Sequence, residues 1–167
     1  MDPLVSDYFL TFSQVAIGFV AFSTIAVVLR EMIASSFDAY QTLLLRFVIE
    51  SGLAATIYAL APVLLAVAGL PQPMLWRVSS GALGVFGVAF PVYYIRRRQR
   101  VKPGRMPTRA VFVTLGTVVI DVQLWLNALT PLFRWSAGPY AIGVTWLLCA
   151  PGIILILTFG EFMRKET

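Results

Sequence analysis

The sequence predicts an all-α integral membrane protein, built as a bundle of five transmembrane helices with short loops. Of its 167 residues, 59% are hydrophobic and 13% are charged, whereas about 25% are charged in a typical soluble domain. The mean hydropathy of +0.82 indicates the same class. Apolar stretches of the ~20 residues that a helix needs to cross the hydrocarbon core recur along the chain. We therefore expect one transmembrane domain over residues 1–167.

Five stretches have this length and character. They cover approximately residues 9–29, 47–69, 78–95, 110–132 and 140–159. The first contains the polar residues Ser13, Gln14 and Thr24 among its apolar residues. Small and polar side chains favour close helix packing, or they line a water-filled path. An alternative fold keeps four spanning helices and makes the first segment a re-entrant or interfacial helix.

Residues 96–109, here called the basic stretch, predict the orientation of the bundle. They contain seven of the thirteen Lys and Arg residues and no acid. Because cytoplasmic loops carry an excess of Lys and Arg, we expect this stretch to be a cytoplasmic loop. The N-terminus then lies outside and the C-terminus lies in the cytoplasm. This arrangement leaves only two basic residues on the outer side, Arg77 and Arg134.

Prolines and glycines predict local features of the second and third spans. Pro62 has no amide hydrogen for the carbonyl of Tyr58, so we expect a kink and a freed carbonyl that needs a new partner. In the third span, Gly81, Gly84 and Gly87 recur at every third residue. Small residues on one face allow two helices to approach closely, so this face should contact another helix.

Asp121 is the most informative residue, because it falls at the centre of the fourth span. A charged carboxylate at that depth costs about 2.5–3.5 kcal/mol on insertion scales. No Lys or Arg lies at comparable depth in another span. The carboxyl is therefore protonated, holds a cation or faces water. A structural alternative is a neutral Asp121 that hydrogen-bonds to Gln14, a threonine or a tyrosine and locks helices together.

Further polar residues accompany Asp121 within the membrane. Thr114 and Thr117 share a helical face with Asp121, while Gln123 and Asn127 share another. Together with the polar residues of the first span, they form the set of candidates for a pore or ion site. These candidates are Asp121, Thr117, Thr114, Gln123, Asn127, Gln14 and Ser13.

Two groups of charged residues lie toward the expected cytoplasmic side. Arg46 and Glu50 are four residues apart and face the same side of a helix, so we expect an ion pair. The pair is either a structural contact or part of a cytoplasmic gate. Basic side chains near an anionic membrane surface contribute about 1 kcal/mol each to binding. The candidate contacts to anionic lipids are Arg96, Arg97, Arg98, Arg100 and Lys102.

The composition argues against several classes of protein. With one cysteine and no histidine, the chain cannot form an internal disulfide and lacks the ligands of zinc, haem and non-haem iron sites. The sequence contains neither a G-x-S-x-G nucleophile motif nor a Walker A loop. We therefore expect no enzyme activity, no cofactor and no metal site. The net charge of +5 comes from residues that flank membrane spans, so nucleic-acid binding is not expected.

These features favour a membrane transport protein, in its simplest form a homo-oligomeric ion channel or pore. Several copies would enclose a central path by rotational symmetry, with a ring of Asp121 carboxylates that favours cations. Two alternatives are a non-catalytic interaction or scaffold subunit and a proton-coupled small-solute carrier that uses Asp121 and Glu50 as protonation sites. The expected partners are the lipid bilayer, anionic lipids and further copies of the chain. Compactness and charge bias favour a bacterial inner membrane.

Overall fold

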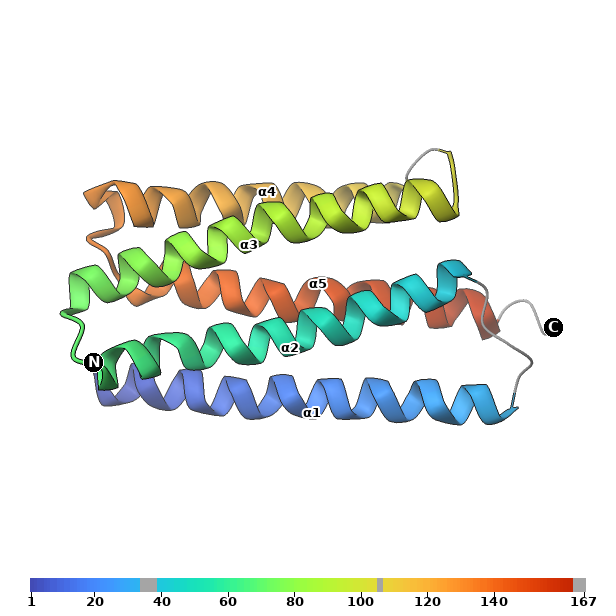
Figure 1. Cartoon of the computed structure of the whole chain (residues 1–167), viewed down its shortest axis with the longest axis horizontal. Helices are drawn as coiled ribbons and strands as arrows, with labels where there is room; N and C mark the ends of the chain where they lie inside the picture. The colour runs from blue at the N-terminus through green and yellow to red at the C-terminus, as the bar shows by residue number, and fades with distance from the viewer. Residues whose placement is uncertain (34–38, 105–106, 164–167) are drawn as a thin grey trace.

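The structure, a computed structural model, describes residues 1–33, 39–104 and 107–163 as a bundle of long helices (Figure 1). Consecutive long helices run in opposite directions, so the N-terminus and the last turns of α5 lie at opposite ends of the bundle (Figure 1). We call the end at which α3 ends and α4 begins the basic end. The elements are α1 (Pro3–Ile33), α2 (Ala39–Val67), α3 (Gln72–Val101), α4 (Thr108–Leu129), the 3₁₀ turn η1 (Pro131–Phe133) and α5 (Ala137–Met163).

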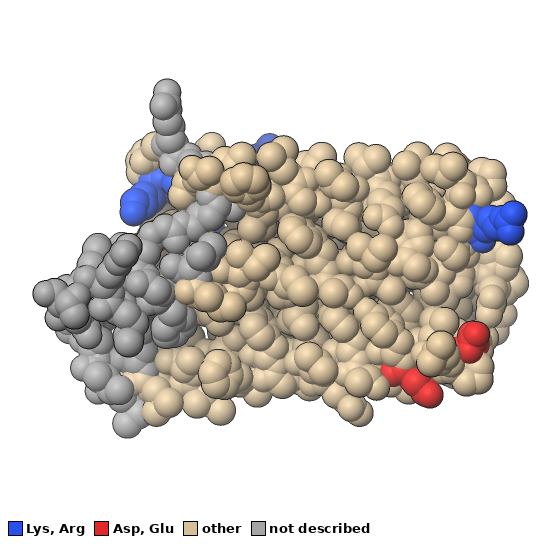
Figure 2. Space-filling view, turned by 180° about the vertical axis from the view of Figure 1, so that it is seen from behind, with Lys and Arg blue, Asp and Glu red and all other residues tan. Residues whose placement is uncertain are grey.

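Five of these helices are long and apolar enough to cross a membrane, which indicates a multi-pass membrane protein. Figure 2 shows a face on which uncharged residues cover the long middle part and charged residues lie mainly toward the ends. Large apolar side chains, such as Phe22, Leu64 and Phe112, are exposed on the outside of the bundle. A water-soluble protein rarely exposes so much apolar surface. Which end faces the cytoplasm stays a prediction.

The first segment does not form a re-entrant turn in this structure. Residues Pro3–Ile33 form one uninterrupted helix, and Figure 1 shows α1 lying alongside α2 along its length. Its polar residues do not break the helix, because Ser13 and Thr24 donate hydrogen bonds to the carbonyls of Leu10 and Val20 in the preceding turn. The hydroxyls of these residues are therefore satisfied within the helix itself.

The basic stretch is largely helical, contrary to the expectation of a loop over residues 96–109. Helix α3 continues to Val101, and the amide of Lys102 donates to the carbonyl of Arg98. Arginine and glutamine are good helix formers, and cations are favourable near the C-terminus of a helix. The helix ends just before Pro103, which has no amide hydrogen with which to continue it.

Each of the other helices begins earlier than its expected span. Two of them, α2 and α4, also end earlier than expected. Helix α4 ends at Leu129 instead of residue 132, because Thr130 adopts an extended conformation before Pro131. Helix α2 ends at Val67 instead of residue 69. Gly69 then turns the chain with a φ of +83°, a conformation that favours glycine.

The glycine face of α3 packs closely against α4, as the spacing of the glycines predicts. A Cβ atom on Gly84 would lie 3.2 Å from the indole of Trp125, and one on Gly81 would lie 3.8 Å from the Cβ of Ala128. The third glycine of the series, Gly87, also faces α4 and contributes to the candidate site below. The absence of side chains on this face thus brings the two helices together.

The carbonyl that Pro62 leaves without a helical donor in α2 accepts a hydrogen bond from a tyrosine of α5. Pro62 lies inside α2, and the hydroxyl of Tyr140 donates to the carbonyl of Tyr58 over 2.5 Å. This carbonyl is the one that Pro62 deprives of its helical partner. The ring of Tyr140 is buried with its centroid 5.6 Å from that of Phe9 and 6.0 Å from that of Trp76. We call Phe9, Trp76 and Tyr140 the aromatic layer; all three are buried in the half of the bundle opposite the basic end.

Candidate functional site

A cavity of about 150 Å³ lies among α2, α3, α4 and α5. It extends from Leu83 and Leu124, near the middle of the bundle, to Tyr40 and Ala110 toward the basic end. The residues that line it come from these four helices and not from α1. Apolar side chains form nearly all of its wall, so each polar group that faces it has a large influence on what it can bind.

Asp121 lies on the wall of this cavity and is 9% exposed. Its carboxyl rests against α3 at Gly87, where an added Cβ atom would overlap Oδ1 of Asp121. Gly87 therefore makes room for the carboxyl. Within the part of the chain that the structure describes, no hydrogen bond or ion pair reaches the Asp121 side chain. The structural alternative, a contact to Gln14, a threonine or a tyrosine, is therefore not formed among these residues.

Thr114 and Thr117 line the same cavity as Asp121, so the predicted face is assembled on one side of α4. Their hydroxyls donate to the carbonyls of Ala110 and Val113, over 2.8 Å and 2.9 Å, within the helix. The hydroxyl oxygen of Thr117 also accepts a hydrogen bond of 3.0 Å from Trp146 Nε1 on α5. Both hydroxyls therefore have other partners, and neither forms a hydrogen bond with the carboxyl of Asp121.

Three further residues shape the cavity. Ser51 on α2 is 1% exposed, lines the cavity and has no hydrogen-bond partner for its hydroxyl among the described residues. Pro91 and Pro151 also line the cavity. Because a proline has no amide hydrogen, each deprives the carbonyl four residues earlier, on Gly87 and on Leu147, of its helical donor. These two free carbonyls could have been predicted from the sequence, because each lies four residues before a proline.

Aromatic side chains form one wall of the cavity. Phe86, Phe90 and Tyr94 follow one another at intervals of four residues on α3, with ring centroids 4.8 Å apart in each step. Phe47 of α2 stacks on Phe90 with a centroid distance of 5.5 Å. Trp146 of α5 also contributes to the cavity. These rings, called the aromatic wall below, were overlooked because aromatic residues are common in all membrane spans.

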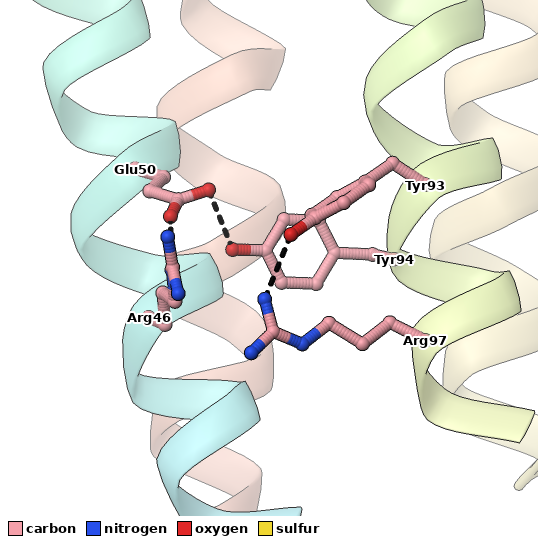
Figure 3. A network of polar contacts seen from close by, with 5 residues as sticks. All are labelled: Arg46, Glu50, Tyr93, Tyr94 and Arg97. Atoms are coloured by element: carbon pink, nitrogen blue, oxygen red, sulfur yellow. Dashed lines mark hydrogen bonds and ion pairs between the residues drawn. The ribbon is translucent and has the colours of Figure 1, made fainter. Parts of the chain in front are cut away.

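Arg46 and Glu50 form the expected pair and belong to a larger network (Figure 3). Arg46 Nε lies 2.5 Å from Glu50 Oε1, and the hydroxyl of Tyr94 donates to Glu50 Oε2 over 2.7 Å. Beside them, Arg97 donates to the hydroxyl of Tyr93 over 2.7 Å. Because Tyr94 also lines the cavity, this network connects α2 and α3 at the cavity wall.

Four of the predicted site residues lie away from the cavity. Asn127 is buried and donates to the hydroxyl of Ser80 over 2.9 Å and to the carbonyl of Ser136 over 3.2 Å. It therefore ties α4 to α3 and to the turn before α5. Gln123 is half-buried outside the cavity, and Gln14 is exposed on the outer surface of α1. Ser13 is buried on the same helix.

The candidate lipid contacts lie at the basic end. Arg96, Arg97 and Arg100 line a shallow groove on the outer side of α3 together with Tyr93. Arg98 instead faces the cavity and donates to the carbonyl of Gly104 over 3.5 Å. Lys102 is the remaining member of the set, and its Nζ lies 4.9 Å from the ring centroid of Tyr40 on α2.

Comparisons with protein families, with curated proteins and with solved structures find no match for this chain. The described residues also contain no group of three or more His, Cys, Asp or Glu side chains that would hold a metal ion. The chemistry of the cavity itself, one unpartnered carboxyl within an apolar and aromatic wall, is therefore the basis for a functional proposal.

Proposed function

We propose that this chain is a membrane transport protein, in which a cation moves along the cavity among α2, α3, α4 and α5 and interacts with Asp121. The observation that carries the proposal is the carboxyl of Asp121, which is 9% exposed, faces the cavity and has no partner among the described residues. A carboxylate inside a membrane protein is costly unless a positive charge or water compensates it. A cation in the cavity supplies that compensation.

The position of Asp121 affects how an oligomer would work. The carboxyl faces the interior of its own bundle, against Gly87, so each copy would carry its own path. Assembly of several copies remains part of the proposal. It is supported by Gln14, whose amide lies exposed on α1 within a candidate span. Polar side chains at such positions favour contact between helices. We place the basic end in the cytoplasm and the protein in a bacterial inner membrane, on the evidence of its charge bias.

The proposal is tested by flux measurements on the purified protein in liposomes. We expect cation-dependent flux from the wild type and at least a tenfold loss in Asp121→Asn, which keeps the shape of the side chain but removes its charge. Asp7→Asn is the matched control, because it removes one negative charge from an exposed residue of α1 far from the cavity. Equal flux from wild type and Asp121→Asn would remove Asp121 from the path. No flux from any form would favour a scaffold subunit.

A proton-coupled carrier is the second candidate, and the aromatic layer favours it. Phe9, Trp76 and Tyr140 pack together in the half of the bundle opposite the basic end and do not line the cavity, which ends before it reaches them. A cavity that ends within the bundle resembles one state of alternating access more than a continuous pore. Uptake by such a carrier saturates with solute concentration and is driven by a pH gradient, whereas a simple pore does not couple solute movement to the pH gradient.

A further inference from the structure

We propose that the cavity binds a small organic ammonium ion, with the charged nitrogen beside Asp121 and its apolar substituents against the aromatic wall. This inference rests on the proposed function, because it names the class of cation that would interact with Asp121. It is carried by three features of the site: an unpartnered acid, an apolar wall rich in aromatic rings, and a volume suited to a small molecule.

A positively charged ligand would compensate the charge of Asp121. Asp121 is 9% exposed and no described residue pairs with it, and electrostatic attraction is stronger in such a poorly solvated place than in water. Two residues that line the same cavity carry further acceptors: the hydroxyl of Ser51 has no partner among the described residues, and Pro91 leaves the carbonyl of Gly87 without a helical donor. Among the described residues, the cation on the cavity wall is Arg98, which lies 11 residues beyond Gly87 along α3, so an anion would find no compensating charge beside this group of oxygen atoms.

The apolar wall distinguishes an organic cation from a metal ion. Metal ions such as Mg²⁺ and Ca²⁺ require about six or more oxygen ligands, and K⁺ in channels is surrounded by carbonyl oxygens. The cavity offers one carboxyl and a few scattered oxygens within a wall of apolar side chains. An ammonium ion with methyl substituents is hydrated less strongly than a small metal ion, and its substituents gain from burial against that wall.

The aromatic wall favours the same class of ligand. The faces of Tyr, Phe and Trp rings attract ammonium groups, and clusters of such rings recognise quaternary ammonium ions. Phe86, Phe90 and Tyr94 form a continuous series along α3, and Trp146 lies on another helix of the same cavity. A cavity of about 150 Å³ accepts a ligand about the size of benzene. Tetramethylammonium and choline are close to this size.

The inference is tested by calorimetric binding to the full-length protein in nanodiscs of zwitterionic lipid. The probes are choline, tetramethylammonium and 3,3-dimethylbutan-1-ol, which has nearly the shape of choline but no charge. We expect saturable binding of both cations and at least tenfold weaker binding of the alcohol. Asp121→Asn should weaken choline binding at least tenfold, Phe90→Leu should weaken it about threefold or more, and Asp7→Asn should leave it unchanged.

Two controls keep the test decisive. Each variant is first shown to elute as a single species with wild-type helix content, and Asp121→Glu serves as a second variant that retains the charge and therefore detectable binding. Equal affinity for choline and the neutral alcohol, or unchanged affinity in Asp121→Asn, would overturn the inference. So would binding of Na⁺ or K⁺ that choline does not displace.

Failure of the inference can be separated from failure of the proposed function. Flux of Na⁺, K⁺ or protons that depends on Asp121, without binding of either ammonium ion, would overturn the inference and leave the transport proposal standing. Binding of choline that depends on Asp121, without any flux of choline or other cations in liposomes, would support the site and overturn the transport proposal.

Discussion

Glu50 and Asp121 are two acids within candidate membrane spans, and their surroundings differ. The side chain of Glu50 is 33% exposed, and both carboxylate oxygens have partners, Arg46 on one side and Tyr94 on the other. Asp121 is 9% exposed and has no partner among the described residues. The fold compensates the first acid with its own side chains and leaves the second to face a cavity. Compensated acids hold helices together, whereas an uncompensated acid requires a ligand, a proton or water.

The largest effect on stability should come from the place where Asp121 meets α3. In Gly87→Ala, the added methyl group would overlap the Asp121 carboxyl, and we expect a loss of about 1–3 kcal/mol. Thermal melting in detergent measures this loss. Gly18→Ala is the control, because a Cβ atom there meets nothing within 4 Å, and it should be neutral or slightly stabilising.

The same substitution in an Asp121→Ala background shows whether the carboxyl is the cause. If it is, the loss from Gly87→Ala should shrink to a few tenths of a kcal/mol, because the shorter side chain leaves room for the methyl group. An undiminished loss in that background would mean that another contact between α3 and α4 is responsible, and the carboxyl would then lie less close to Gly87.

A second prediction extends the contrast from carboxyl groups to backbone carbonyls. Tyr140→Phe removes the hydroxyl that donates to the carbonyl of Tyr58, and an unsatisfied buried acceptor costs about 1–2 kcal/mol. In a Pro62→Ala background the restored amide takes over as donor, so Tyr140→Phe should then cost much less. Unfolding of the four variants in a double-mutant cycle measures the coupling. Additive losses would show that the tyrosine hydroxyl does not replace the missing amide.

The smallest expected change in stability comes from a direct comparison of Glu50 and Asp121. Glu50→Gln weakens the contacts to Arg46 and Tyr94, and we expect a loss of about 1 kcal/mol, since the side chain is partly exposed. Asp121→Asn should melt no lower than the wild type, because it removes a buried charge that no described residue compensates. Thermal melting of both variants under the same conditions measures the difference. Greater damage from Asp121→Asn than from Glu50→Gln would contradict the contrast.

The sequence predicts those features that depend on spacing along the chain. Five apolar stretches of sufficient length gave the five candidate spans, and the spacing of Arg46 and Glu50 gave their ion pair. The free carbonyl of Tyr58 also follows from covalent structure, because a proline always deprives an earlier carbonyl of its donor. Each of these inferences involves residues on one helix.

Features that depend on the rotation of one helix against another were not predicted. A membrane helix is apolar on all sides, so its pattern of residues does not indicate which face turns inward. The partnership of Tyr94 with Glu50, which are 44 residues apart, therefore could not be read from the sequence. The same holds for the inward position of Asp121 beside Gly87 and for the outward position of Gln14. The helical course of the basic stretch was missed because charge was given more weight than helix propensity.

The two prolines of the cavity also determine where the bundle yields most easily. Pro91 in α3 and Pro151 in α5 line the cavity, and a helix that bends at a proline gives up no hydrogen bond that it had. We therefore expect the segments between these prolines and the basic end to move outward more easily than the far half, where the rings of Phe9, Trp76 and Tyr140 pack together. The basic end is thus the end of the bundle that we expect to open, and the aromatic layer is the end that we expect to stay closed.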